Sequence, residues 1–219
     1  MRSMIPALMT KEVRLVMHPM TLVVLGLSAL VLVPNWPYAV ILLYACLCPY
    51  FNAQSAREQR DLDYLATLPV SRREAAAARV AATALADAAC VALMGAFSLL
   101  RPLVGTPGTV VGMPPNLAFL GFSLLTFAVF DLIYYALYFR DPSRIGVPLV
   151  VASVPTLAVM LGFEAAPYLS PAFAELLAQP GLSNPGAQLA VLAAGAVAFV
   201  AGHLIAARLA GKAFERVDI

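Results

Sequence analysis

The feature that most constrains this chain is a series of apolar runs, each close to the length of about 20 residues that a helix needs to cross a bilayer. We count six, at about 19–34, 37–56, 76–100, 117–139, 145–163 and 187–209. Hydrophobic residues make up 62% of the chain and charged residues only 12%, a composition far from that of a soluble domain. We therefore expect an all-α polytopic membrane protein, with six transmembrane helices in a single domain over residues 1–219.

The positions of the basic residues indicate how these helices are oriented. When the six runs are threaded back and forth across a bilayer, all of the 14 lysines and arginines except Arg101 fall on one side. Basic connections stay in the cytoplasm, so both termini are predicted to be cytoplasmic, in a bacterial-type inner membrane or a plasma membrane. The net charge of +2 gives no indication of nucleic-acid binding.

A helix lying in the membrane interface is predicted over residues 4–18, ahead of the first run. Its two faces differ in polarity, with Ile5, Leu8, Met9, Val13 and Val16 on one and Lys11, Arg14 and His18 on the other. This separation is typical of interfacial helices, and Pro19 then marks the bend into the membrane. The same residues also suit an ordinary basic anchor for the first span, and the two interpretations are compatible.

The one long polar insert on the cytoplasmic side covers residues 55–75. A helix is predicted to start at Ser55 and to end near Thr67, because Pro69 disfavours a helical conformation in the residue before it. Ser71 and Glu74 have the spacing of a capping box, in which each side chain accepts the backbone N–H of the other residue. A second helix therefore begins there and continues into the third run.

The outer connections differ from each other. Residues 101–116 are rich in glycine and proline without a helical period, so a turn-bearing loop is predicted. In the last outer connection, Ser170 is a good helix N-cap and Pro171 suits the first helical position. We expect a short helix over 170–179 that dips into the outer leaflet.

A search for catalytic machinery finds little. The chain has no phosphate-binding loop, and with only His18 and His203 it has no HExxH metal site. His203 is the one candidate base within a run, but no serine lies in a nucleophile elbow, which makes a hydrogen-bonded packing role for His203 the favoured interpretation. We therefore expect no enzyme activity, cofactor or metal ion on this chain.

Two acids lie inside the apolar runs, at similar depths from the cytoplasmic side. Unpaired acids in a bilayer are costly, so Asp87 and Asp131 should face protein, water or a partner. Each belongs to a polar stripe at helical spacing, Arg79, Thr83 and Asp87 on the third run and Asp131, Tyr134, Tyr135 and Tyr138 on the fourth. One interpretation is that these faces line a substrate path or a seam between subunits. The alternative is an aromatic belt at the interface, with acids that only fix helix packing.

Six runs, an N-terminal amphipathic helix and a 2–3 connection with a charged helix followed by Leu68, Pro69, Val70 and the 71–74 capping box together resemble the small permease subunits of type-2 ATP-binding-cassette (ABC) exporters. The resemblance in architecture covers the whole chain, and the specific motif covers about 55–80. The chain is short for that family, which leaves almost no extracellular domain.

This resemblance implies a permease without ATPase activity, driven by a separate cytoplasmic ABC ATPase that binds ATP and Mg²⁺, and paired with a second permease copy or a paralogue. The residues implied to couple to the ATPase are Arg57, Glu58, Arg60, Asp61, Asp63, Tyr64 and Leu65, followed by Pro69, Ser71, Arg72, Arg73 and Glu74. The implied function is export of an amphipathic or hydrophobic substrate, such as a peptide, an antimicrobial or a drug. The alternative is an ion-coupled secondary transporter that uses Asp87 and Asp131, although no inverted repeat is evident.

Overall fold

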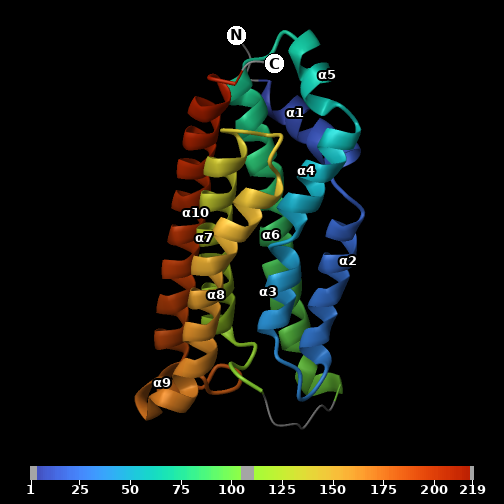
Figure 1. The fold of residues 1–219 in the computed structure, drawn as a ribbon. Helices are drawn as coiled ribbons and strands as arrows, with labels where there is room; N and C mark the ends of the chain where they lie inside the picture. Colours follow the sequence, from blue (N-terminus) through green and yellow to red (C-terminus); the bar gives the residue numbers. More distant parts are fainter. Residues whose placement is uncertain (1–3, 105–110, 218–219) are drawn as a thin grey trace.

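The computed structural model describes residues 4–104 and 111–217 and is an elongated bundle of helices (Figure 1). The described residues contain no β-strand, which confirms the all-α prediction. In chain order the elements are α1 (Ile5–Lys11), a π-helix (Glu12–Val16), α2 (Met20–Leu27), a 3-10 helix (Ser28–Leu32), α3 (Ala39–Ala45), α4 (Cys48–Glu58), α5 (Asp61–Thr67), α6 (Arg72–Val104), α7 (Leu117–Tyr138), α8 (Gly146–Leu169), α9 (Pro171–Leu177) and α10 (Pro185–Phe214).

Five helical segments among the described residues are long and apolar enough to cross a membrane, namely Ala39–Glu58, α6, α7, α8 and α10. The count reaches six only if Ile5–Val16 and Met20–Leu32 together form one span, and these two segments meet at an angle of 90°. The six predicted runs are therefore found in part. The helices α6, α8 and α10 are longer than the runs that predicted them, because each continues beyond its apolar stretch.

The bend predicted at Pro19 is present, and the segment before it packs on the protein. Leu8 and Val16 are buried, whereas Val13, expected on the same apolar face, is 40% exposed. The π-helix changes the angular spacing of side chains, so a face drawn for a regular α-helix does not continue through it. Glu12, the first residue of the π-helix, is buried on the same side as Leu8, which lies four residues earlier.

The polar insert on the 2–3 side is divided differently from the prediction. The prediction of one continuous helix from Ser55 to Thr67 is wrong. In the structure α4 ends at Glu58, and a separate helix, α5, begins at Asp61. Between them Arg60 adopts a left-handed conformation (φ 52°), which a regular helix cannot accommodate. The consequence is a separate short helix, α5, that stands off the end of the bundle beside α1 (Figure 1).

Helices α7 and α10 approach each other very closely. Gly121 of α7 and Gly195 of α10 face each other so closely that a Cβ atom on either one would overlap backbone atoms of the other helix. Farther along, Gly202 lies against Ala128. Small residues at such positions let membrane helices approach each other. Close packing therefore joins α7 to α10, with α8 packed against α7 and α6 packed against α10.

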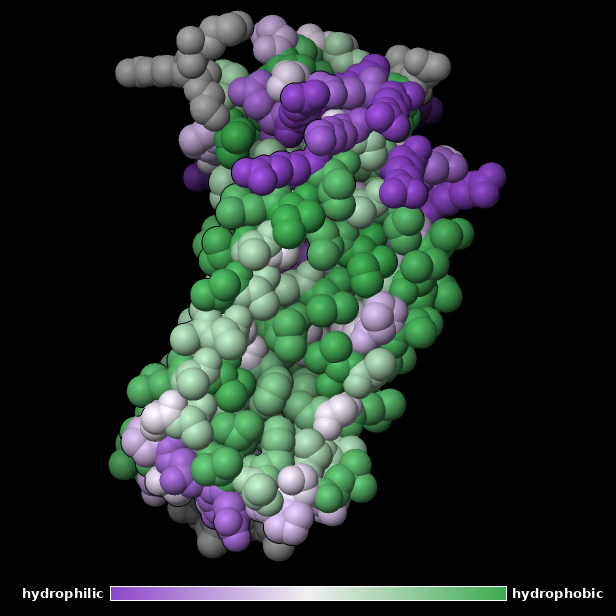
Figure 2. Space-filling view, turned by 90° about the vertical axis from the view of Figure 1, so that its left-hand side faces the viewer, coloured by the Kyte–Doolittle hydropathy of each residue, from purple (hydrophilic) through white to green (hydrophobic). Residues whose placement is uncertain are grey.

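The surface separates polar ends from an apolar middle. Figure 2 shows the side of the molecule that carries α10, with a broad hydrophobic belt between two groups of polar side chains. Along α10, Val197 is 70% exposed and Leu204 is 56% exposed. Such a belt suits hydrocarbon rather than water, which supports a membrane-embedded protein.

Helix α1 begins and helix α10 ends at the same end of the bundle, which we call the terminal end (Figure 1). The opposite end, the far end, carries α9. Ser170 Oγ accepts a hydrogen bond from Phe173 N–H at 3.3 Å, which confirms the predicted N-cap of this short helix. In the loop predicted at 101–116, residues 101–104 belong to α6, and residues 105–110 lie outside the described residues.

Candidate functional site

Polar side chains along one face of α6 point into the bundle. Arg79, Thr83 and Asp87 are four residues apart, so they lie one above another on the helix, and all three are buried. Arg79 meets Tyr138 of α7 and Thr83 meets Tyr135 of α7, while Asp87 lies deeper, in a group of three side chains. The two polar stripes predicted on the third and fourth runs therefore face each other inside one chain.

Four charged side chains form what we call the charge cluster, at the terminal end of this face: Lys11, Glu12, Asp61 and Arg79. The guanidinium of Arg79 donates to both carboxylate oxygens of Glu12, at 2.9 and 3.3 Å, and also to Asp61 Oδ2. Lys11 Nζ lies 2.6 Å from Asp61 Oδ1 and 2.9 Å from Glu12 Oε1. None of the four side chains is more than 11% exposed. Two cations and two anions thus neutralise one another where water is scarce.

The charge cluster joins segments that are distant in sequence. Lys11 and Glu12 lie where α1 meets the π-helix, Asp61 is the first residue of α5, and Arg79 lies on α6. Arg79 Nη1 also donates to the hydroxyl of Tyr138 on α7 at 3.1 Å. The charge cluster therefore ties α5 to α6 through the contact between Asp61 and Arg79.

The tyrosines of α7 are interior residues. Tyr135 is 1% exposed and its hydroxyl lies 2.6 Å from Thr83 Oγ1, and Tyr138 is 2% exposed. Tyr134, also buried, donates to the carbonyl of Pro49 at 3.2 Å and so contacts α4 instead. The alternative of an aromatic belt at the membrane surface, which concerned Tyr135 and Tyr138, does not agree with the burial of these two residues. They also do not lie on an outer face that a second subunit could contact in this structure.

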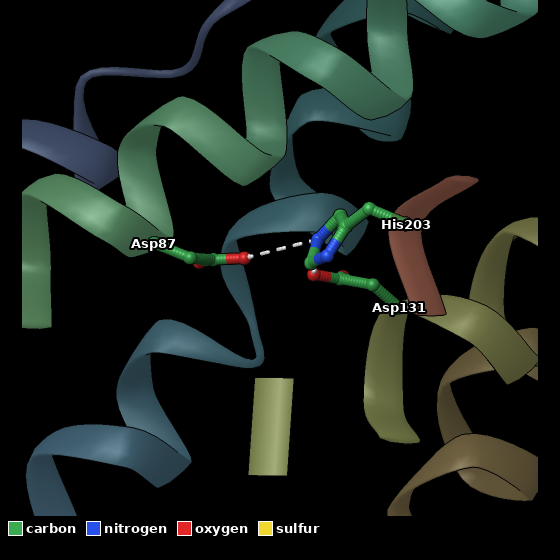
Figure 3. Close-up of side chains that lie close together, drawn as sticks. All are labelled: Asp87, Asp131 and His203. Carbon is green, nitrogen blue, oxygen red and sulfur yellow. Dashed lines mark hydrogen bonds and ion pairs between the residues drawn. The ribbon is translucent and has the colours of Figure 1, made fainter. Parts of the chain in front are cut away.

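The deepest part of the polar face is a group of three side chains from three helices, which we call the acid–histidine cluster: Asp87 of α6, Asp131 of α7 and His203 of α10 (Figure 3). His203 Nε2 lies 3.0 Å from Asp131 Oδ2 and 3.9 Å from Asp87 Oδ2. All three residues are buried. The two intramembrane acids were expected to need a partner, and the structure brings them to the same histidine.

The residues expected to couple to an ATPase are divided between surface and interior. Two of them, Asp61 and Leu65, are buried, and two, Arg72 and Glu74, are part-buried. The others are exposed, namely Arg57, Glu58, Arg60, Asp63, Tyr64, Pro69, Ser71 and Arg73. Asp61 belongs to the charge cluster and Leu65 packs into the apolar core. Neither presents a side chain to a partner here, which differs from the expectation for these two residues.

The start of α6 is held by the predicted capping box. Ser71 Oγ accepts the N–H of Glu74 at 3.2 Å, and Glu74 Oε2 accepts the N–H of Ser71 at 3.3 Å, which confirms the motif. The next two residues bind the end of α10: Arg72 donates to the carbonyl of Phe214 at 3.4 Å, and Arg73 pairs with Glu215 at 2.6 Å. These contacts fix the base of α6 to the end of the chain's last helix.

Sequence reasoning missed part of both clusters. The sequence places Lys11 on the polar face of an interfacial helix and favours a packing role for His203, and it predicts no role for Glu12. For Glu12 a signal existed in the helical spacing, since it lies seven residues after Ile5 and four after Leu8, on the apolar face of the predicted interfacial helix. For His203 a signal existed: a polar residue in an apolar run, at a depth comparable to those of two unpaired acids.

Comparison of the chain with protein-family models, with curated proteins and with solved structures found no match. The fold and the surface define only a class of protein. This class is a helical protein with several helices that are long and apolar enough to cross a membrane. Any more specific function has to be argued from the geometry of this chain.

Proposed function

We propose that this chain is the permease subunit of an ABC exporter, which moves an amphipathic or hydrophobic substrate with ATP hydrolysed by a separate cytoplasmic subunit. The observation that carries the proposal is the placement of α5. It is a short charged helix outside the bundle, and its first residue, Asp61, is bound to Arg79 in the third long helix. A helix connected in this way suits the transfer of movement from a partner to the membrane part.

The proposed division of roles follows the exposure of the side chains. Arg57, Arg60, Asp63 and Tyr64 form the contact surface for the ATPase, since all four are exposed at the terminal end. Asp61 does not touch the ATPase and instead transmits the displacement of α5 to α6. ATP binding by the partner then shifts the balance between inward-facing and outward-facing states, to the extent that the partner binds one state more tightly.

The substrate path in this proposal lies along the polar face between α6 and α7. Thr83 and Tyr135 close this face in the present structure, because their hydroxyls are bonded to each other. A shift of the part of α6 that precedes Asp87 against α7 would separate them. A second permease copy or a paralogue completes the pathway, and the apolar belt of α8 and α10 faces lipid or that copy.

The test is co-purification. The tagged chain, purified from its own cells in mild detergent, should bring with it a protein that contains a phosphate-binding loop and hydrolyses ATP. Reversal of the exposed charges (Arg57→Glu, Arg60→Glu and Asp63→Lys) should abolish that association.

A matched control lies on the neighbouring connection at the terminal end. Reversal of Arg140, Asp141 and Arg144 changes the same number of charges with the same signs but leaves α5 intact, so the ATPase should remain bound. A chain that purifies in active form without any ATPase would refute the proposal.

A second candidate, an ion-coupled secondary transporter, is favoured by one observation: both intramembrane acids converge with His203 in the acid–histidine cluster. The two candidates differ in their source of energy. In membrane vesicles with ATP present, transport by a secondary transporter stops when an ionophore collapses the ion gradient, whereas transport by the proposed exporter continues.

A further inference from the structure

The protonation of His203 can be read from one of its two contacts. His203 Nδ1 lies 2.8 Å from the carbonyl oxygen of Phe199, one turn earlier on α10. A carbonyl oxygen can only accept, so Nδ1 carries a hydrogen and donates it. In the neutral ring Nε2 then has a free lone pair, and this lone pair faces Asp131 Oδ2 at 3.0 Å. Two acceptors at that distance need a cation between them.

A proton between Asp131 and His203 would satisfy that one contact and leave the rest of the cluster unsatisfied. Asp87 Oδ2 and Asp131 Oδ1 are both buried and have no hydrogen-bond partner. The nearby cation Arg79 is already bound to Glu12 and Asp61. Within the described residues, no lysine or arginine pairs with either acid. The cluster therefore has two carboxylates that a single divalent ion could neutralise together.

We propose that Asp87, Asp131 and His203 form a binding site for a divalent transition-metal ion, with Zn²⁺ as the best match, that fastens α6, α7 and α10 to one another. The donor atoms lie within 4.8 Å of one another. Ligand distances for Zn²⁺ are about 2.0–2.2 Å, so two ligand atoms on one tetrahedral ion lie about 3.4 Å apart. The observed 3.0 and 3.9 Å from His203 Nε2 to the two carboxylates lie on either side of that value.

The chemistry of the donor set selects the kind of ion. Imidazole suits zinc and its neighbours in the first transition row, whereas Mg²⁺ and Ca²⁺ bind through oxygen ligands alone. Metal-binding histidines usually donate their other ring N–H to a backbone carbonyl or a carboxylate, as Nδ1 of His203 does toward Phe199. Three protein ligands leave one tetrahedral position for a further ligand. This proposal does not depend on the ATPase, because the site lies wholly within this chain.

The test uses Co²⁺ as a spectroscopic probe for the Zn²⁺ site. The full chain in detergent, first treated with a chelator, is titrated with Co²⁺. We expect one ion per chain with the visible absorption of tetrahedral Co²⁺, displacement by Zn²⁺, no displacement by Mg²⁺, and a higher thermal unfolding temperature with Zn²⁺ than without. Absence of that absorption from the wild-type chain would overturn the proposal, whatever the variants do.

Variants of the proposed ligands test whether the ion binds at this cluster. Asp87→Asn and His203→Gln should each weaken Zn²⁺ binding by at least about 10–100-fold, the range found even for outer-shell partners of metal ligands. Glu164→Gln is the matched control, since Glu164 also has a buried oxygen without a partner but lies elsewhere, on α8. Equal loss of affinity in this control, or intense thiolate-to-cobalt charge-transfer absorption from cysteine, would show that the ion binds somewhere else.

Discussion

Arg79 is a buried cation whose guanidinium contacts Glu12, Asp61 and Tyr138 at once. Its replacement by methionine keeps much of the volume but leaves two buried carboxylates with Lys11 as the only cation in the cluster. Removal of one partner from a buried ion pair costs about 3–5 kcal/mol. We therefore expect Arg79→Met to lower the free energy of unfolding in detergent micelles by that amount, measured by denaturant titration.

The control for this prediction is Arg73, which pairs with Glu215 on the surface, where the two side chains are 63% and 43% exposed. Exposed ion pairs contribute little to stability, so Arg73→Gln should leave unfolding nearly unchanged. Equal losses from the two substitutions would mean that the charge cluster is open to water.

The hydrogen bond between the hydroxyls of Thr83 and Tyr135 leads to a second prediction, which concerns the free energy of unfolding. Thr83→Val or Tyr135→Phe alone leaves one buried hydroxyl without its partner, which costs about 1–3 kcal/mol. The double variant removes both hydroxyls and should cost less than the sum of the two single variants. Strict additivity in this double-mutant cycle would show that the two hydroxyls are not bonded.

The residues of the polar face illustrate what sequence can and cannot reveal about a site. The stripes on α6 and α7 follow from helical spacing alone, and the burial of Asp87 and Asp131 follows from the cost of placing acids in lipid. That Asp61 would join them could not be predicted. Its burial depends on the helix break at Arg60, which turns the first residue of α5 toward Arg79.

Among the helices, the α7–α10 pair makes the sharpest prediction. A methyl group at Gly195 would overlap the backbone of Gly121, so the two helices must separate. Overpacking of this kind costs about 1–3 kcal/mol, and Gly195→Ala should lower the thermal unfolding temperature. Gly162 on α8 has no atom near the added methyl group, so Gly162→Ala should be neutral or slightly stabilising. A stable Gly195→Ala variant would contradict the close approach of α7 and α10.

The positions of the helices could be predicted where the length of an apolar run determines where a helix begins and ends. The run at 117–139 corresponds closely to α7 (Leu117–Tyr138), and the capping box marks the start of α6. The breaks were predictable only in part. The bend before the first span follows from Pro19, whereas the division of span two between α3 and α4 was not predicted.

At the scale of the whole molecule, the common position of the start of α1 and the end of α10 predicts an even number of membrane crossings. In that case the bent pair of Ile5–Val16 and Met20–Leu32 contributes one crossing. Protease-cleavable tags at the two termini should both be cut in inside-out vesicles and both be protected in intact cells. Opposite protection of the two tags would mean five crossings and would exclude this arrangement.

The central claim, that α5 binds a separate ATPase, is tested most directly by site-specific photocrosslinking. Tyr64 on α5 is 52% exposed and Tyr168 at the far end is 71% exposed, so the two sites are comparable in access. Each is replaced by a photoreactive phenylalanine in cells of the source organism, and the adducts are identified by mass spectrometry. We predict an adduct with a phosphate-loop ATPase from position 64 and none from position 168. No ATPase adduct at position 64, or the same adduct at both positions, would contradict the account.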